Sequence, residues 1–178
     1  MSEESAEISK TAARPFAANA IHLVRTAQQI NVSLSQMADQ KASILMGATF
    51  VVFTISVGQA RSGGFSLALM VLALFSFLSA MLAVFAVLPS VKGKAPAGSP
   101  NLLFFGVFTR MSETEFADAV LEELHADETV FRTMLRDIYQ NGEVLQHKKY
   151  KYLGWAYHTF LVGLVLTFLS FVGQYLVY

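Results

Sequence analysis

Two arginines, Arg132 and Arg136, stand four residues apart in a stretch with helical periodicity, so both would lie on one helical face. Guanidinium groups form charge-assisted hydrogen bonds with phosphate and carboxylate oxygens. Neighbouring segments supply a further cation, aromatic side chains, and polar groups that can form hydrogen bonds with the edge of a planar ligand. These residues are Asn101, Phe104, Phe105, Arg110, Asp137, Tyr139 and Asn141. These residues together predict a binding site for a small anion. The competing interpretation is structural, because Glu128 and Arg132 also form an ordinary i,i+4 pair.

No motif for catalysis accompanies this set. The sequence contains no GxxxxGK[ST], HExxH or GxSxG pattern, its four histidines are scattered, and it has no cysteine. We therefore expect no enzymatic activity, no catalytic residue, no metal site and no cofactor. Nucleic acid is not an expected partner either, because the 13 basic and 13 acidic residues cancel.

The elements that position these residues are set by three long apolar blocks. Residues 42–60, 64–88 and 152–178 contain no Asp, Glu, Lys or Arg, and the chain is 54% hydrophobic and only 15% charged. A helix needs about 20 apolar residues to cross the hydrocarbon core of a membrane. The sequence therefore predicts an all-α, multi-pass membrane protein with three transmembrane helices and a small, mainly helical cytoplasmic domain.

The distribution of Lys and Arg predicts the orientation of these helices. Four of these residues precede the first span and eight lie between the second and third: Lys10, Arg14, Arg25 and Lys41, then Lys92, Lys94, Arg110, Arg132, Arg136, Lys148, Lys149 and Lys151. The first hairpin carries Arg61 alone. Since basic residues stay on the cytoplasmic side, we expect the N-terminus inside the cell and the C-terminus outside.

The segments outside the spans have their own organisation. Residues 1–15 are predicted as a disordered tail. Residues 16–41 are predicted as a helical stalk that runs without a break into the first span, because apolar side chains recur at steps of four and three: Leu23, Ala27, Ile30, Leu34 and Met37.

Residues 89–151 are predicted as a cytoplasmic linker and sensor region. The Pro/Gly/Ser-rich stretch 92–100 is a linker, and 101–108 is expected to be strand-like or irregular. Ser112 and Glu115 form a capping box that starts a helix over 113–125. Asp127 is expected to cap a longer helix that continues into the third span unless Asn141-Gly142 breaks it.

Two ions stand at the entry of the first span. Asp39 and Lys41 are two residues apart and face different directions on a helix, which argues against a direct pair. We expect Lys41 to meet lipid headgroups or an acidic residue, and Asp39 to meet a cation of the third helix, namely Lys148, Lys149 or Lys151. Such contacts would couple the sensor region to the membrane helices.

Small and polar residues form one face on two of the spans. In the third span they recur at steps of three and four: Ala156, Thr159, Gly163, Thr167, Ser170 and Gln174. Thr49, Ser56 and Gln59 do the same in the first span. These faces predict close helix packing, or, in a homo-oligomer, the lining of an aqueous path.

Three segments, ADQKASILMG at 38–47, NLLFFGVF at 101–108 followed by MSETEF, and RDIYQNGEVLQHKKYKYLGWAYHTF at 136–160, resemble the Pycsar effector transmembrane family of bacterial anti-phage defence. The resemblance implies a bacterial inner-membrane protein whose functional partner is a pyrimidine cyclase. It also implies a cyclic pyrimidine ligand, either 3',5'-cyclic CMP or cyclic UMP. Because the chain departs from larger relatives in having no separate nucleotide-binding domain, the sensor would lie in its short cytoplasmic part, which contains the candidate anion site, or in a partner.

Two hypotheses of function remain open. In the first, the chain is a ligand-gated effector that binds the cyclic nucleotide in its cytoplasmic part and impairs the membrane as a homo-oligomer. In the second, it is a non-gated membrane scaffold that anchors a cytoplasmic partner.

Overall fold

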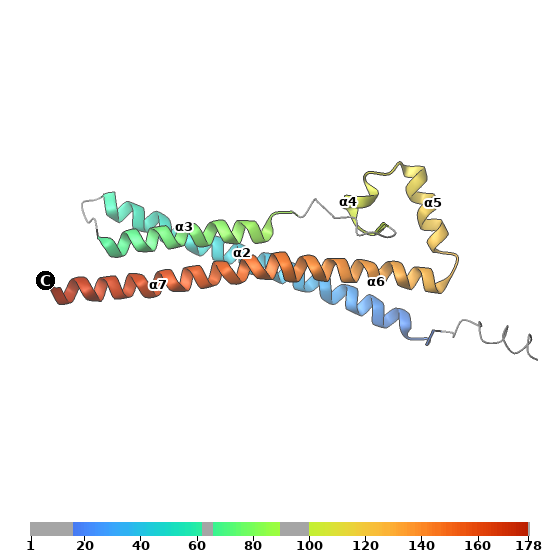
Figure 1. Cartoon of the computed structure of the whole chain (residues 1–178), viewed down its shortest axis with the longest axis horizontal. Coiled ribbons are helices and arrows are strands. Elements are labelled where there is room, and N and C mark those ends of the chain that lie inside the picture. The colour runs from blue at the N-terminus through green and yellow to red at the C-terminus, as the bar shows by residue number, and fades with distance from the viewer. Residues whose placement is uncertain (1–15, 62–65, 90–99, 178) are drawn as a thin grey trace, which may run out of the picture.

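The computed structural model describes residues 16–61, 66–89 and 100–177. The predicted disordered tail and nearly all of the predicted linker lie outside the described residues. Within the described ranges the chain forms helices and turns without a strand. Figure 1 shows three long helices side by side at the C-terminal end of an elongated molecule, with the short helices α4 and α5 at the other end.

The first long helix, α2, runs without interruption from Ala20 to Arg61. It confirms the predicted continuous helix, although it begins four residues later than Phe16. The second, α3 (Leu67–Val87), returns antiparallel to α2, and the hydroxyl of Ser66 accepts a hydrogen bond from the backbone N–H of Leu69 at its start. Such a cap satisfies one of the free donors of the first turn.

The third long helix combines three segments in one continuous path: α6 (Asp127–Val144), the π-helical turn η2 (Leu145–Tyr150) and α7 (Lys151–Val177). Asn141-Gly142 lies inside α6 and does not break it. The expectation that Asp127 caps α6 is wrong, because Ala126 occupies the cap position with no side-chain bond and Asp127 is the first helical residue. There its carboxylate still faces the positive end of the helix dipole.

Residues 100–126, between the linker and α6, form turns and two short helices. The strand-like alternative for 101–108 is wrong, since Phe105–Phe108 forms a single helical turn, α4. The side chain of Asn101 directs this turn by accepting a hydrogen bond from the backbone N–H of Leu103. A side-chain bond two residues ahead gives the backbone a turn in place of a strand ladder.

Helix α5 (Glu113–Glu123) starts with the predicted capping box, which the structure confirms. The Ser112 hydroxyl accepts from the Glu115 backbone N–H, and the Glu115 carboxylate accepts from the Ser112 backbone N–H. This backbone hydrogen bond, reinforced by the Ser112 hydroxyl, lowers the pKa of Glu115. The box therefore fixes where the chain turns from α4 into α5.

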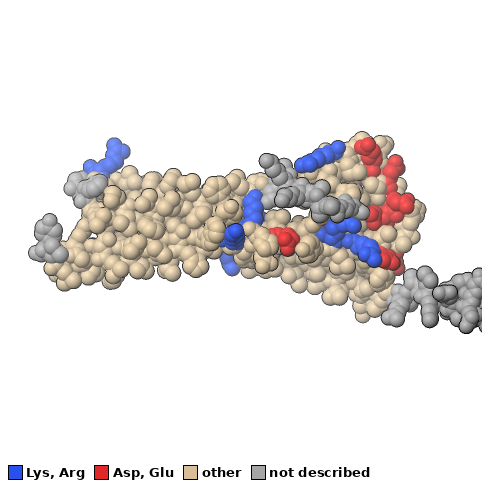
Figure 2. Space-filling view, in the orientation of Figure 1, with Lys and Arg blue, Asp and Glu red and all other residues tan. Residues whose placement is uncertain are grey.

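Three helices are long and apolar enough to cross a membrane, and the chain is a membrane protein. We call α3, α7 and residues 42–61 of α2 the apolar half, and the other described residues the polar half. Figure 2 shows an almost uncharged surface over the apolar half, with charged side chains at its boundary and over the polar half.

Small side chains bring the helices of the apolar half together. Its buried positions are mostly Ala, Ser and Thr: Ala42, Leu45, Thr49 and Ser56 of α2; Ala68, Ser76, Ser79, Ala83 and Ala86 of α3; Leu153 and Ala156 of α7. The Ser79 hydroxyl donates to the Ala156 carbonyl at 2.8 Å, across α3 and α7. In lipid, association of helices depends on such close contact because apolar surface gains nothing by leaving hydrocarbon.

We predict that Gly163→Ala destabilises the packing of α3 on α7. A Cβ atom at Gly163 would overlap the Cβ of Phe75 and lie 2.9 Å from its Cγ, which forces the helices apart. Such overpacking costs about 1–3 kcal/mol, and each 1 kcal/mol lowers Tm by about 2–4 °C in a chain of this size. Thermal unfolding in detergent measures the shift.

Gly173→Ala on the same helix is the matched control, because a Cβ there meets nothing within 4 Å. Equal Tm values for the two variants would contradict the packing described here.

Candidate functional site: the polar half and its junction with the membrane helices

A buried polar cluster ties α2, α6 and the 100–104 turn together. Asp137 of α6 is 6% exposed and Asn101 of the turn is 3% exposed. The Asp137 Oδ1 accepts from the Asn101 amide at 3.2 Å, and Oδ2 accepts from the Gln28 amide of α2 at 3.1 Å. The Asn101 side-chain amide also donates to Oε1 of the Gln140 side chain at 3.0 Å.

In this cluster the Asp137 carboxylate of α6 connects that helix to α2 and to the 100–104 turn. Both Asp137 oxygens accept from neutral amides, so the carboxylate is satisfied by hydrogen bonds from side chains that come from two different elements. A buried carboxylate without such bonds would be costly, and the loss of one donor therefore disturbs the whole junction. Of the predicted ligand residues, Asn101 and Asp137 are the two that the described structure joins by a hydrogen bond between side chains.

The two arginines lie on the outer side of α6. Arg132 is exposed and donates to the Glu128 carboxylate at 2.6 Å and 2.9 Å, which is the i,i+4 pair of the structural interpretation. Arg136, one turn on, donates to the Pro100 carbonyl at 3.3 Å. Tyr139 follows three residues later and is 69% exposed. Spacings of four and three place all three side chains on one face of α6, beside the turn.

The remaining predicted ligand residues are more dispersed. The rings of Phe104 and Phe105 lie 5.0 Å apart at the start of α4, with Phe105 being 55% exposed. Arg110 is exposed just after α4. Asn141 lines a small crevice between α2 and the α6–η2 segment, of about 190 Å³, that Asn31, Ser35, Gln36 and Lys149 also line.

The boundary between the two halves contains an ion pair. Lys149 donates to both oxygens of Asp39, at 2.6 Å and 2.8 Å, and to the Ser35 hydroxyl at 2.7 Å. The structure thus places Asp39 against one of the three lysines named from the sequence. Lys148 donates to the Leu88 carbonyl at the end of α3 at 2.6 Å, whereas the side chain of Lys41 is exposed.

Both lysines belong to the π-helical turn η2. From there the adjacent side chains of Lys148 and Lys149 reach α3 and α2 respectively. Just beyond it, Lys151 lies 5.0 Å from the ring of Trp155, and aromatic residues of this kind gather at membrane interfaces. Isolated π turns within α-helices are frequent at functional sites.

The small faces of the spans point mainly into the subunit. Thr49, Ser56, Ala156 and Gly163 are buried, and Thr159, Thr167, Ser170 and Gln174 are partly buried. Hydroxyls on these faces bond carbonyls of their own helices, as Thr49 does with Leu45 and Thr167 with Gly163. These positions support close packing within one subunit.

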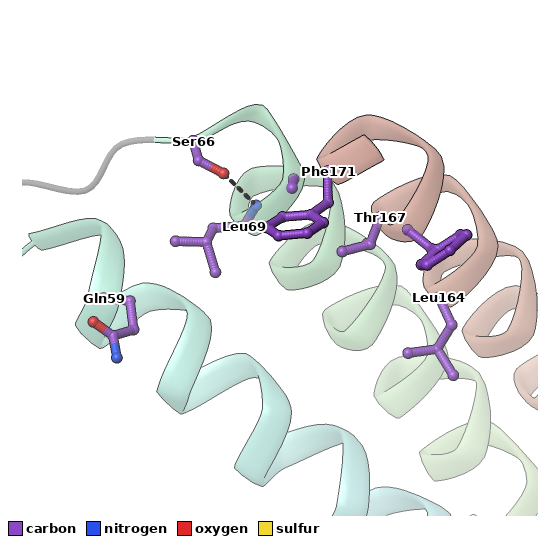
Figure 3. Close-up of a pocket in the computed structure, with 8 residues that line it drawn as sticks. Gln59, Ser66, Leu69, Leu164, Thr167 and Phe171 are labelled. Carbon is purple, nitrogen blue, oxygen red and sulfur yellow. Dashed lines mark hydrogen bonds between the residues drawn. The ribbon is translucent and has the colours of Figure 1, made fainter. Parts of the chain in front are cut away.

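The far end of the apolar half is more open. A pocket of about 820 Å³ lies between α3 and α7 and is lined mainly by Leu69, Leu164, Phe168 and Phe171. Figure 3 shows Gln59 of α2 on the opposite side of this space from Thr167. Gln59 is exposed in the single subunit, unlike Thr49 and Ser56 of the same predicted face.

Sequence reasoning missed several participants. Gln28, Ser35 and Gln140 supply essential hydrogen bonds at the junction, yet each is a common polar residue in a helix with nothing in its spacing to distinguish it. The π turn was missed as well. Among the described residues, no group of three or more His, Asp or Glu side chains is arranged to hold a metal ion.

Comparison with known proteins gives one match. A family model described as the Pycsar effector protein domain matches residues 22–174, nearly the whole chain. No curated protein and no solved structure matches. The matched region contains the buried cluster, the boundary ion pair and all three membrane helices.

We predict that the boundary ion pair contributes more to stability than the exposed pair on α6. Lys149 and Asp39 have side-chain exposures of 19% and 40%, against 69% and 54% for Arg132 and Glu128. Lys149→Met or Asp39→Asn should cost about 1–2 kcal/mol, because the remaining partner stays poorly solvated. The double-mutant cycle should give a coupling energy of similar size, measured by thermal unfolding in detergent.

The Glu128→Gln and Arg132→Gln cycle is the control and should give about 0.3–0.5 kcal/mol. If the two cycles give the same coupling, the boundary pair is an ordinary surface pair and does not join the halves.

Proposed function

The chain belongs to the Pycsar effector protein family, and on that premise we propose that it is the membrane effector of a cyclic-pyrimidine anti-phage signalling system. Its polar half binds 3',5'-cyclic CMP or cyclic UMP made by a pyrimidine cyclase. Its apolar half then impairs the bacterial inner membrane as a homo-oligomer. The chain carries out no catalysis and needs no cofactor or metal.

The exposed face of α6 with Arg132, Arg136 and Tyr139 is the observation that supports a nucleotide site. Two guanidiniums one turn apart suit the oxygens of a cyclic phosphate, and an exposed tyrosine ring offers a surface for stacking the base. The two present partners of the arginines, a surface carboxylate and a single carbonyl, are exchangeable for phosphate.

The junction gives this site a route to the membrane. A phosphate that draws Arg136 away from the Pro100 carbonyl releases one of the bonds between α6 and the turn. Because Asp137 is the next residue, the buried cluster follows any rotation of α6 at this point. The continuous α6–η2–α7 path transmits that rotation to Lys149, and thus to Asp39 of α2.

We predict that purified protein binds cyclic CMP or cyclic UMP and that Arg132→Gln with Arg136→Gln weakens binding at least about tenfold. The substitutions remove charge-assisted hydrogen bonds worth about 1.5–3 kcal/mol each. Calorimetry with cyclic CMP, cyclic UMP and cyclic AMP measures affinity, and dye release from liposomes measures membrane impairment.

Arg25→Gln, which makes the same substitution at a single arginine on α2, is the control and should bind and leak like the wild type. Binding of all three nucleotides no tighter than about millimolar would refute the effector mechanism and favour the scaffold hypothesis.

A second prediction concerns orientation. Because Lys and Arg are concentrated in the polar half and its boundary, that half should be cytoplasmic. A reporter fused after Tyr178 should be active only in the periplasm, and one inserted at Gly98 only in the cytoplasm. The reverse pattern would place the arginine face where a cytoplasmic nucleotide cannot reach it.

A further inference from the structure

An exposed apolar stripe with a spacing of seven residues runs along α2. Three of its members belong to the polar half: Leu23, Ile30 and Met37, which are 73%, 54% and 45% exposed. The same spacing continues in the apolar half with Ile44 and Val51, which are 63% and 54% exposed. We call these five residues the α2 stripe.

The rest of the subunit does not cover the α2 stripe. Helix α6 contacts another side of α2, where Val24 and Ala38 are buried and where Gln28 and Ser35 form hydrogen bonds. Figure 1 shows α4 and α5 on the far side of α6 from this part of α2. Lipid can cover Ile44 and Val51, but the polar half lies outside the apolar helices, so Leu23, Ile30 and Met37 face water in the single subunit.

A seven-residue spacing is specific to one kind of partner. A straight α-helix turns by about 20° per heptad relative to this repeat, so a strict stripe lies on one face only when helices supercoil around each other. Ala27 and Leu34, each four residues after a member of the stripe, supply the second apolar position of a heptad and are half-buried beside it. The pattern therefore fits a parallel helix better than a flat or irregular surface.

The continuity of the α2 stripe from the polar into the apolar half identifies the partner helix. A partner that covers Leu23 to Val51 must run from water into the bilayer in the same direction as α2, with an apolar face in both environments. A second copy of α2 meets this requirement because every copy enters the membrane with the same orientation. The charge distribution is compatible with a second copy as the partner. Arg25 is the only Asp, Glu, Lys or Arg residue between Ile21 and Ala38, so two identical faces of α2 do not repel each other.

We propose that the α2 stripe is the interface between copies of this chain, in which α2 helices pack in parallel from Leu23 through Val51. This proposal rests on the proposed function in one respect: the proposed function requires a homo-oligomer, and the α2 stripe supplies its interface. It leaves the exposed face of α6 on the outside of the assembly, where nucleotide can reach it. Ligand binding and assembly then use opposite sides of the α2–α6 pair.

Single cysteines test the interface directly, because the natural chain has none. Leu23→Cys, Ile30→Cys and Met37→Cys are placed separately in the full chain and oxidised in native membranes without nucleotide. Each should form a disulfide-linked dimer on a non-reducing gel, since equivalent positions of parallel helices face each other. Val32→Cys, which is 51% exposed on another side of α2, is the control for random collision and should not.

A second set of variants separates interface loss from misfolding. Met37→Cys combined with Leu23→Glu and Ile30→Glu should lose the dimer band, whereas Met37→Cys with Val32→Glu should keep it at equal membrane abundance. Equal crosslinking at positions 30 and 32, a product of another size than the dimer, or dimers unaffected by the two glutamates would each overturn the proposal.

The same preparations distinguish this proposal from the proposed function. Crosslinking at 23, 30 and 37 in a protein that leaks with no cyclic nucleotide supports the interface and refutes gating. Nucleotide-dependent leakage without crosslinking at these positions supports the effector and refutes the interface.

Discussion

The ion pair between Asp39 and Lys149 joins the two helices that pass from the polar into the apolar half. Helix α2 and the α6–η2–α7 path both cross this boundary without a break, since a backbone entering hydrocarbon keeps its hydrogen bonds only inside a helix. Two long helices joined only within the bilayer would separate in water. The boundary pair and the Asp137 cluster, about three helical turns above it on α6, hold them together there and so determine where the turn and α5 are placed.

In this arrangement, α2 and α6 of the polar half are direct continuations of membrane helices, so a movement of either one is passed to the apolar half. Because α6 continues into α7, a small rotation of α6 cannot be absorbed by a flexible linker and must be taken up at η2. Single π turns within α-helices are rare and frequently lie at functional sites, which makes η2 the natural place for such a change. Lys148 and Lys149, which reach α3 and α2 from this turn, would change partners together.

The sequence predicted the features that depend on local patterns. Uncharged runs of about 20 residues indicate spans, and Ser112 with Glu115 indicates a helix start, because each feature is decided by neighbouring residues. The 101–108 segment was misjudged because its outcome depends on Asn101, whose side chain is held by Asp137 and Gln140 more than 30 positions away. Gln28 and Ser35 could not be found for the same reason, since only the crossing of α2 and α6 gives them partners.

The packing of the apolar half would allow the proposed ligand to act on it from a distance. The largest fully buried side chains in the described chain are Thr49, Ser56, Ser76 and Ser79, and only Leu45 and Leu153 add larger buried side chains to the membrane helices, so small residues make most of their close contacts. Large residues such as Leu161 and Phe168 of α7 point outward, where lipid satisfies them equally well in any arrangement of the helices. Close contact of small residues is a short-range interaction that a slight displacement removes. A displacement of α2 against the α6–η2–α7 path at the boundary would therefore loosen the helix contacts of the apolar half.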